Sequence, residues 1–328
     1  MNPAPRPRSL LWPILLVGAG VILLLANLNV IPLASLALLF RLWPLLLVVA
    51  GLDVLFGRRL PWLGGLVGLV VVALVVAFLL AAPRIGLPAP PQAQTGRFVE
   101  PLGEASAARV TLDLTDAPTT IQPLADSDDL IDANLVYLGE IVFTVRGEAE
   151  KAVSLSQRLD PSLVLANPFE LSEEVRWHIG LTPQVPLELT VDGGSGTVEA
   201  DFGMLQLAGL AVDIGSGQID LALPAGGERY LARFDGGSGQ MSIRIPDGAA
   251  VELEIEGGSG EIVLDVPDTA VRVEVRDSGS GEVRVPAGLD LVSGDDDEGV
   301  WETCDSAGAD RRITIRVEGV GSGSIEVR

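Results

Sequence analysis

Residues 236–260 read GGSGQMSIRIPDGAAVELEIEGGSG, and this stretch contains the pattern that decides the fold. It holds one full interval between two Gly-Ser-Gly triplets, and Pro246 divides the interval into two halves. Apolar and polar residues alternate in each half; the apolar positions are Met241, Ile243 and Ile245, then Val251, Leu253 and Ile255. Alternation with a period of two predicts strands that bury one face. The stretch therefore predicts a strand, a proline-marked corner, a second strand and a glycine corner.

The Gly-Ser-Gly triplet recurs along the C-terminal part of the chain. Its serines are Ser195, Ser216, Ser238, Ser259, Ser280 and Ser322, at spacings of 21, 22, 21, 21 and 42 residues. We interpret the last spacing as two periods with one degenerate copy, near the acidic segment Asp295–Glu298. A constant period of about 21 residues predicts a repeat architecture.

Two all-β folds fit this period. In a parallel β-solenoid, each strand pairs with the equivalent strand about 21 residues away, and the apolar positions stack into ladders. In an antiparallel meander, each triplet is a hairpin loop, so that Ile255 lies opposite Ile262. Stacking requires equal coil lengths whereas hairpins do not, so the constant period favours the solenoid.

The N-terminal part of the chain is apolar. Three stretches, at about 10–28, 36–56 and 60–82, approach the roughly 20 residues that a membrane-spanning helix needs. The sequence LWPILLVGAG at 11–20 recurs as LWPLLLVVAG at 42–51, and proline is favourable in the first turn of a helix. No small-residue cleavage site follows the first stretch, so we expect three transmembrane helices rather than a cleaved signal peptide.

The charge of the chain is divided near the same boundary. Residues 1–96 hold six arginines and one acid, a net charge of +5, whereas residues 97–328 hold 16 basic and 43 acidic groups, a net charge of −27. Phosphate backbones would repel this acidic segment, so nucleic acid is not an expected partner. If the chain crosses the membrane three times, two arginine pairs lie on the same side of it: Arg6 with Arg8, and Arg58 with Arg59. The positive-inside rule therefore predicts a multi-pass cell-membrane protein with a cytoplasmic N-terminus and an extracytoplasmic C-terminal domain.

These patterns divide the chain into four parts. Residues 1–82 form the expected transmembrane region, residues 83–97 a proline-rich linker, residues 98–180 an irregular β cap, and residues 181–328 the Gly-Ser-Gly β-repeat domain. The cap is expected because a solenoid needs its open ends covered. The predicted class is a three-helix transmembrane region followed by an all-β domain.

The two halves together resemble a bacterial arrangement. The duplicated Leu-Trp-Pro-x-Leu-Leu-Val stretch resembles the LiaI/LiaF-like transmembrane region. The Gly-Ser-Gly-x-apolar-x-apolar repeats are similar to the toastrack, or "putative adhesin", β domains that follow such regions, and the segment from Arg97 to Val145 resembles their entry portion. The resemblance to LiaF-like proteins implies a role in sensing cell-envelope stress, by modulating a partner histidine kinase in response to cell-wall-active antibiotics. It implies no catalytic residue.

Several features have a structural explanation beside a functional one. The stacked serines either form a stripe that binds glycans or ions, or are present because a small residue fits a tight corner. We favour the second, structural explanation. The segment Asp295–Glu298 has carboxylates for calcium but not the spacing of a calcium loop, so we expect a solvated turn. Asp53 is expected at the membrane interface near Arg58 and Arg59 rather than as an intramembrane relay.

Catalytic chemistry finds little support in the sequence. His178 and Cys304 are the lone histidine and the lone cysteine, and we expect both to be structural. The outward residues Asp220, Arg244, Asp265 and Arg284 are expected to form ion pairs between repeats. We predict no catalytic, cofactor-binding or metal-binding residue and no cofactor. Glycan cleavage is disfavoured because no groove of pattern-breaking carboxylates is evident.

The sequence thus predicts a non-enzymatic, multi-pass membrane protein of the bacterial envelope that acts in envelope-stress sensing or regulation through protein–protein interaction. The alternative is an adhesin or structural scaffold that projects a β-solenoid from the membrane. The expected partners are the lipid bilayer and, beyond it, a membrane histidine kinase, a cell-wall glycan or a second copy of the chain.

Overall fold

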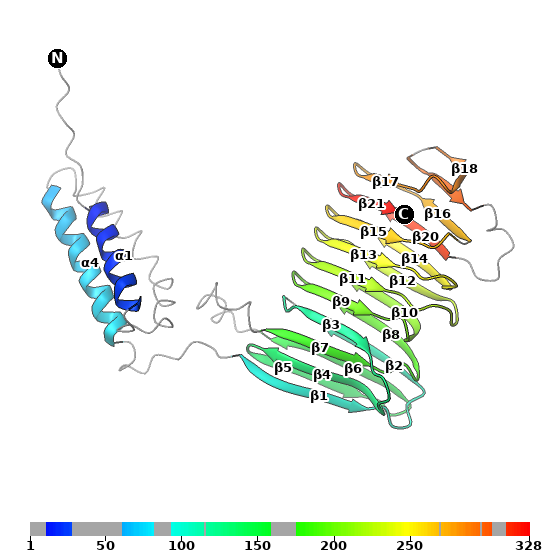
Figure 1. Cartoon of the computed structure of the whole chain (residues 1–328), viewed down its shortest axis with the longest axis horizontal. Coiled ribbons are helices and arrows are strands. Elements are labelled where there is room, and N and C mark those ends of the chain that lie inside the picture. Colours follow the sequence, from blue (N-terminus) through cyan, green and yellow to red (C-terminus); the bar gives the residue numbers. More distant parts are fainter. Residues whose placement is uncertain are drawn as a thin grey trace, which may run out of the picture. The chain divides into compact units, whose positions relative to one another are not determined.

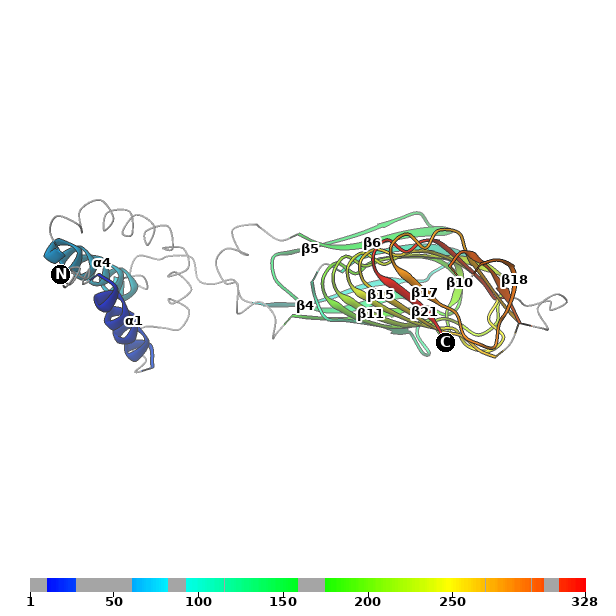
Figure 2. The same cartoon turned by 90° about the horizontal axis from the view of Figure 1, so that it is seen from above.

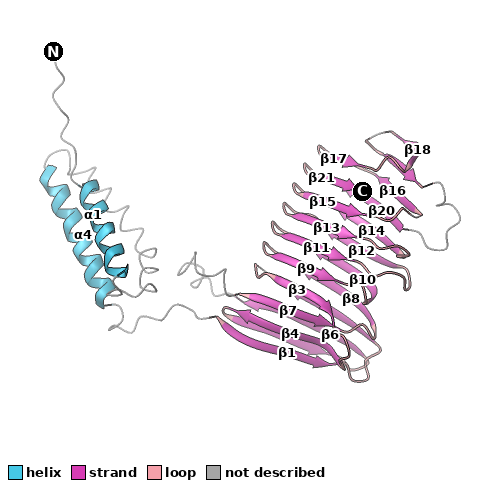
Figure 3. Cartoon of the chain, viewed as in Figure 1, coloured by secondary structure: helices cyan, strands magenta, loops and turns pink. Residues whose placement is uncertain are grey.

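The computed structural model describes residues 11–27, 61–81, 93–114, 116–158, 175–268, 270–295, 297–303 and 313–328. The chain divides into two compact units, which are described separately. Within the described residues, the first unit contains the helices and the second contains the strands. Figure 1 labels these elements along the chain, and Figure 3 shows that the second unit is built from strands and the loops that join them.

The first unit contains helix α1, Leu11–Asn27, and helix α4, Pro61–Ala81. The helices meet at Gly18, where an added Cβ atom would lie 2.5 Å from Val72 Cγ2, so that only glycine fits. Both helices lie inside the predicted stretches 10–28 and 60–82, whereas the predicted stretch 36–56 lies outside the described residues. No helix within the described residues is both long enough and apolar enough to span a membrane. The three membrane-spanning helices therefore stay a prediction.

The second unit consists of two β-sheets. Sheet 1 has ten strands in the spatial order β1-β4-β7-β3-β9-β11-β13-β15-β21-β17. Their bounds are β1 Gln94–Pro101, β3 Thr119–Pro123, β4 Asp129–Tyr137, β7 Arg176–Leu181, β9 Thr197–Asp201, β11 Gln218–Ala222, β13 Gln240–Arg244, β15 Glu261–Asp265, β17 Glu282–Arg284 and β21 Ser324–Val327.

Sheet 2 has 11 strands in the order β18-β19-β16-β20-β14-β12-β10-β8-β2-β6-β5. Their bounds are β2 Ala107–Asp113, β5 Glu140–Arg146, β6 Glu150–Arg158, β8 Pro186–Asp192, β10 Gln206–Asp213, β12 Tyr230–Asp235, β14 Val251–Glu256, β16 Val271–Val275, β18 Asp290–Gly294, β19 Gly299–Glu302 and β20 Ile313–Gly319.

The middle of both sheets is parallel and in register. Each Gly-Ser-Gly corner joins a strand of sheet 2 to the next strand of sheet 1, and we term this strand–corner–strand unit a rung. Figure 2 shows the rungs as successive turns. Met241 in β13 lies opposite Ile219 and Ile262, so equivalent residues of consecutive repeats stack. The predicted parallel stacking is confirmed for these rungs.

The antiparallel meander is wrong. Ile255 and Ile262 lie in different sheets, where Ile255 pairs with Phe234 and Val317, and Ile262 pairs with Met241 and Ile325. An all-parallel solenoid does not describe the complete sheets either, because antiparallel strands lie at their ends. β1 and β4 pair antiparallel in sheet 1, as do β5 with β6 and β18 with β19 in sheet 2. Both sheets are therefore mixed.

The rungs do not follow one another in chain order at the β17 end of the stack. The rung β20–β21 lies between β14–β15 and β16–β17, because β20 pairs with β14 and β16 while β21 pairs with β15 and β17. Our interpretation of the 42-residue spacing was wrong. The segment 290–302 forms the hairpin β18–β19 at the edge of sheet 2 rather than a degenerate rung between Ser280 and Ser322.

The segment expected to be an irregular cap contains strands stacked like those of the rungs. β2 and β3 lie between β8–β9 on one side and β6 and β7 on the other, with parallel pairing throughout. The sequence between β2 and β3 contains no Gly-Ser-Gly triplet, which explains why the sequence pattern did not reveal this pair. Strand β1 begins at Gln94, inside the predicted linker 83–97.

The interior between the two sheets is apolar. Inward positions such as Leu112, Leu187, Ile243 and Leu253 are fully buried, as the alternating pattern requires. At the β1 end, the two sheets are also joined by an ion pair and by aromatic side chains. The Lys151 ammonium from sheet 2 lies 2.5 Å from the Glu100 carboxylate of sheet 1. Phe98 also packs on Phe143, with ring centroids 5.8 Å apart, so that side chains of both sheets close this end.

Candidate functional site

The stacked Gly-Ser-Gly corners form one edge of the second unit. Their backbones continue the ladder of hydrogen bonds from rung to rung: Ser238 N–H donates to Gly215 O at 2.7 Å, and Ser259 N–H donates to Gly237 O at 2.7 Å. Ser322 N–H in turn donates to Gly258 O at 3.0 Å. The corners are therefore part of the sheet structure, and their serines lie in one column.

The glycines are required by this close stacking. A Cβ atom on Gly260 would collide with the carbonyl oxygen of Gly239, and one on Gly239 would collide with that of Gly217. The glycine that precedes the serine also has no space for a side chain, because a Cβ atom on Gly258 would collide with the carbonyl oxygen of Gly237. Only the position between the two glycines has space for a side chain, which accounts for the serine.

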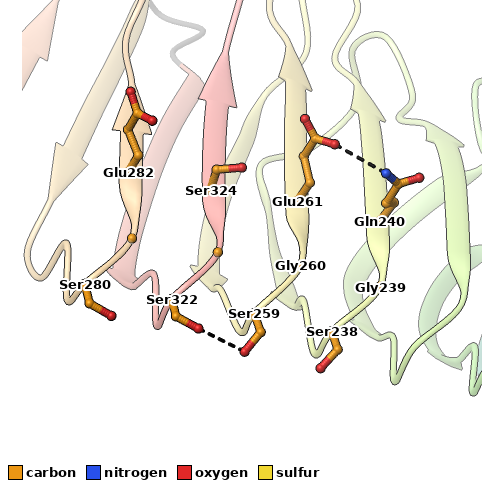
Figure 4. Close-up of a pocket in the computed structure, with 12 residues that line it drawn as sticks. Ser238, Gly239, Gln240, Ser259, Gly260, Glu261, Ser280, Glu282, Ser322 and Ser324 are labelled. Carbon is orange, nitrogen blue, oxygen red and sulfur yellow. Dashed lines mark hydrogen bonds between the residues drawn. The ribbon is translucent and has the colours of Figure 1, made fainter.

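Side chains on and beside these corners line a shallow groove of about 710 Å³. Figure 4 shows the serines in the spatial order Ser280, Ser322, Ser259 and Ser238. A second column, from the first residue of each strand, runs beside them: Glu282, Ser324, Glu261 and Gln240. The groove therefore presents hydroxyl, carboxylate and amide groups at the repeat distance of a parallel sheet, roughly 4.8 Å.

Several polar groups of the groove already bind one another. The hydroxyls of Ser259 and Ser322 lie 3.1 Å apart, and Ser280 Oγ donates to Gly321 O at 3.1 Å. Gln240 Nε2 donates to Glu261 Oε2 at 3.4 Å. No group of three or more histidine, cysteine or acidic residues among the described residues is arranged to hold a metal ion. The groove is therefore a hydrogen-bonding surface.

A column of acidic residues, which we term the acidic ladder, lies just before the corners, where the strands of sheet 2 end. The last residues of five neighbouring strands of sheet 2 are in register: Asp113, Asp192, Asp213, Asp235 and Glu256. Two of these carboxylates also support the corner that follows. Asp192 Oδ1 accepts a hydrogen bond from Gly194 N at 3.2 Å, and Asp235 Oδ1 accepts one from Gly237 N at 3.4 Å. The sequence carried this signal, because an acid precedes most triplets, but we did not identify it.

The ladder shifts the acidity of its central member. Partial burial raises the pKa of Asp213 above its ordinary value, and the neighbouring carboxylates of Asp235 and Asp192 raise it further. Both causes act against the charged form. The ladder therefore concentrates like charge along the sheet, at some cost to the folded state at neutral pH.

The outer face of sheet 2 carries ion pairs between rungs. Arg233 Nε lies 2.8 Å from Glu254, and Arg276 Nη1 lies 2.8 Å from Glu318. Arg316 connects two rungs at once, because it binds Glu252 on one side and its Nε lies 3.8 Å from Glu274 Oε2 on the other. These pairs offset much of the acid on this face.

The individually predicted residues have ordinary surroundings. His178 lies exposed in β7, opposite Thr120 and Asn134. Of the expected pairs between repeats, Arg244 Nε lies 4.0 Å from Asp265, whereas Arg284 binds Glu282 of its own strand at 2.9 Å. Asp220 accepts a hydrogen bond from Gln218, also in its own strand, at 2.9 Å. Asp53 and Cys304 lie outside the described residues.

The acidic segment after β18 forms a turn. Asp295 Oδ1 accepts hydrogen bonds from the backbone N–H groups of Glu298, at 2.9 Å, and Asp297, at 3.1 Å. These bonds stabilise the carboxylate and lower the pKa of Asp295 below its ordinary value. The turn is thus held by its own backbone, which is the structural explanation that we favoured.

The fold and surfaces define a class: a β protein of two stacked mixed sheets, preceded in the chain by an apolar helical unit. Comparison with protein families identifies the two parts of the chain more closely. Residues 94–244 match the N-terminal domain of toast_rack (DUF2154), and residues 10–55 match the LiaI-LiaF-like transmembrane region. The chain thus carries a LiaI-LiaF-like transmembrane region followed by a toast_rack domain, the architecture that the sequence resemblance predicted. These matches fit a membrane-associated protein.

Three solved structures resemble the chain at low identity. One is a "putative cell adhesion protein" from Clostridium sporogenes, at 20% identity and a TM-score of 0.48, covering 72% of this chain and 99% of that one. Another is a "putative adhesin" from Bacteroides fragilis, at 13% identity and a TM-score of 0.28, covering 73% and 99%. The third is a "putative lipid binding protein" from Parabacteroides distasonis, at 12% and 0.29, covering 72% and 97%. No curated protein sequence matches the chain.

Proposed function

We propose that this chain is a non-enzymatic, multi-pass protein of the bacterial cell envelope that regulates an envelope-stress response by binding other proteins. The order of its parts is the observation that carries the proposal: a LiaI-LiaF-like transmembrane region is followed by a toast_rack domain. The β domain supports it, because its described surface offers long columns of hydrogen-bonding and charged groups. Such columns suit binding to an extended partner.

We further propose the arrangement in the membrane. Three helices, at about 10–28, 36–56 and 60–82, anchor the chain, a linker follows within 83–97, and the β stack, with its parallel middle rungs, lies outside the cytoplasm. The arginines at positions 6, 8, 58 and 59 support this orientation through the positive-inside rule. Reporter fusions after residue 328, one active only outside and one active only inside the cytoplasm, test it. A signal from the cytoplasmic reporter would reverse the proposed sidedness.

A genetic experiment tests the regulatory role. The gene is deleted in its host, the cells are challenged with cell-wall-active antibiotics, and the output of the stress-responsive histidine kinase is measured with a promoter reporter. We expect an altered output, restored by the full chain but not by residues 1–92 alone. An output that does not differ from the parent strain at any antibiotic dose would rule out the regulatory role.

The second candidate is an adhesin or structural scaffold, and the groove of serine hydroxyls and carboxylates favours it. A flat column of such groups can hydrogen-bond to the hydroxyls of a glycan chain. Co-sedimentation of the full chain, in detergent, with purified peptidoglycan tests this function. Binding that falls when both Gln240 and Glu261 are replaced by alanine would support the scaffold, whereas equal binding by the parent and the variant would exclude the groove.

A further inference from the structure

The rung β20–β21 occupies a slot between two rungs that precede it in the chain. β20 pairs with β14 on one side and β16 on the other, and β21 pairs with β15 and β17. Figure 1 shows β21 between β15 and β17, at a place where the chain order alone would put β17 next to β15. The slot is therefore complementary to residues 313–328 on both of its walls.

The contacts of this rung come from residues distant in the chain. Ser322 N–H donates to Gly258 O at 3.0 Å, and its hydroxyl lies 3.1 Å from that of Ser259. Arg328 N–H donates to Leu264 O at 2.9 Å. Ile315 and Val317 are fully buried between the sheets. All these contacts depend on the slot and none on the connection to β19, so the same segment from another molecule can make every one of them.

The two walls of the slot are also in register with each other. Leu253 and Val273 both lie opposite Ile315, and Ile262 and Val283 both lie opposite Ile325. If the rung leaves, inward apolar residues of one wall therefore meet inward apolar residues of the other, and Glu252 meets Arg272. The two walls thus present matched positions, so that a rung from either copy enters the slot in one register.

The connection to the rung is long enough for exchange. Residues 303–312 join β19 to β20, and ten residues span at most about 33–36 Å when extended. That length is several times the distance of roughly 4.8 Å between neighbouring strands. Exchange of an identical element between copies needs no new complementary surface, and it is a low-cost route to dimers.

We propose that the slot between β14–β15 and β16–β17 is a strand-exchange interface, in which residues 313–328 of a second copy of this chain replace those of the first. In the exchanged dimer each β domain completes its two sheets with the rung of the other copy, and the chain connections before that rung join the two copies. The partner is thus this chain itself, and the inference holds whichever role the assembled protein has.

Single cysteines in two tagged copies test the exchange. Both full-length chains carry Cys304→Ser, which removes the only native cysteine; one adds Ser259→Cys and the other adds Ser322→Cys. The copies are co-expressed, and their membranes are oxidised with copper phenanthroline. We expect a disulfide-linked heterodimer carrying both tags, because the two hydroxyls lie 3.1 Å apart across the slot.

Two controls make the result decisive. Ser238→Cys replaces Ser259→Cys in the first control, since Ser238 lies one rung farther from the slot and a disulfide cannot reach. We expect its heterodimer to be at least five-fold weaker. The second control places Ser259→Cys and Ser322→Cys in one chain, where an intramolecular link confirms the position of the rung. A heterodimer no stronger than the first control would overturn the proposal, as would absence of any link between positions 259 and 322, within or between copies, in the second control.

Discussion

At the scale of single residues, stacking sets strict limits on the corners. The triplet glycines lie so close to the rung below that a methyl group has no space, whereas the intervening serine points away from the stack. The serine column is therefore a consequence of the same geometry that selects the glycines. This explains how a polar stripe can arise without selection for a ligand, and it gives a direct test.

We expect Gly260→Ala to destabilise the β domain. The new Cβ would collide with the carbonyl oxygen of Gly239, which is fixed in the ladder by Glu261 N–H. Overpacking against fixed backbone costs about 1–3 kcal/mol or more in the free energy of unfolding. Urea unfolding followed by circular dichroism measures it. Gly288→Ala is the matched control, because no heavy atom lies within 4 Å of its added Cβ. Equal stability of the two variants would contradict the stacking described here.

The acidic ladder gives a prediction with a defined pH dependence. Because the pKa of Asp213 is raised on folding, the folded state binds its proton more tightly, and ionisation at neutral pH costs stability. We expect Asp213→Asn to raise the free energy of unfolding at pH 7 by a few tenths of a kcal/mol, the scale of exposed charge interactions. The gain should shrink as the pH falls through the raised pKa of folded Asp213, and it should vanish below the ordinary value of 3.8, where this side chain is protonated in both the folded and the unfolded state.

Urea unfolding of the parent and variant between pH 3.5 and 7 measures this difference. Asp247→Asn, in the turn between β13 and β14, serves as a control outside the ladder. A constant difference across the pH range, or a variant that is less stable at pH 7, would show that the charge of Asp213 does not destabilise the folded state.

At the scale of elements, charge helps to fix which rung occupies the slot. Arg316 of β20 binds Glu252 of β14 and approaches Glu274 of β16, so it bridges both neighbours of its strand. Its side chain is 29% exposed, and Glu252 and Glu274 are 25% and 23% exposed. Partly buried pairs of this kind are screened less by solvent than pairs on the open surface. Arg316 is therefore the charged group that most specifically selects the rung for its slot.

We expect Arg316→Ala to lower the free energy of unfolding by about 1 kcal/mol, because the bridge between β14 and β16 is lost although Glu252 keeps Arg229 and Glu274 keeps Arg276 as partners. Arg244→Ala is the matched control: Arg244 is 74% exposed, and its closest acid is 4.0 Å away. That substitution should cost less than about 0.5 kcal/mol. Equal losses in chemical unfolding would show that the bridge by Arg316 does not stabilise the rung.

The sequence predicted the elements better than their order. Period-two alternation around Met241 and Leu253 predicted the strands, and the 21-residue interval predicted their parallel stacking. The position of residues 313–328 was not predictable, because Val273 and Ile315 offer equivalent inward apolar groups and either rung fits next to Leu253. The rung β2–β3 lacked the triplet that marks the others. The serine column was predicted from the sequence, but the groove beside it and the acids that end the strands of sheet 2 were not.

At the scale of the β domain as a whole, rung order is interlocked at both ends. The first rung along the chain, β2–β3, lies inside β6–β7, and the last, β20–β21, lies inside β16–β17. Each inserted rung has a neighbour on both sides, so neither can fray as a simple terminal strand does. Stability along this stack therefore does not decline toward the last residues in sequence. The edges are instead β1, β5, β17 and β18.

Hydrogen exchange measured by mass spectrometry tests this organisation. Amides in 313–327 should be protected as strongly as those in 251–265, since both rungs pair on two sides. Amides in 282–294 should exchange much faster, because β17 and β18 are edge strands and local opening is least costly there. A stack in chain order reverses the ranking of the last two segments, with 313–327 exposed at the end. Faster exchange in 313–327 than in 282–294 would therefore refute the inserted rung and, with it, the slot.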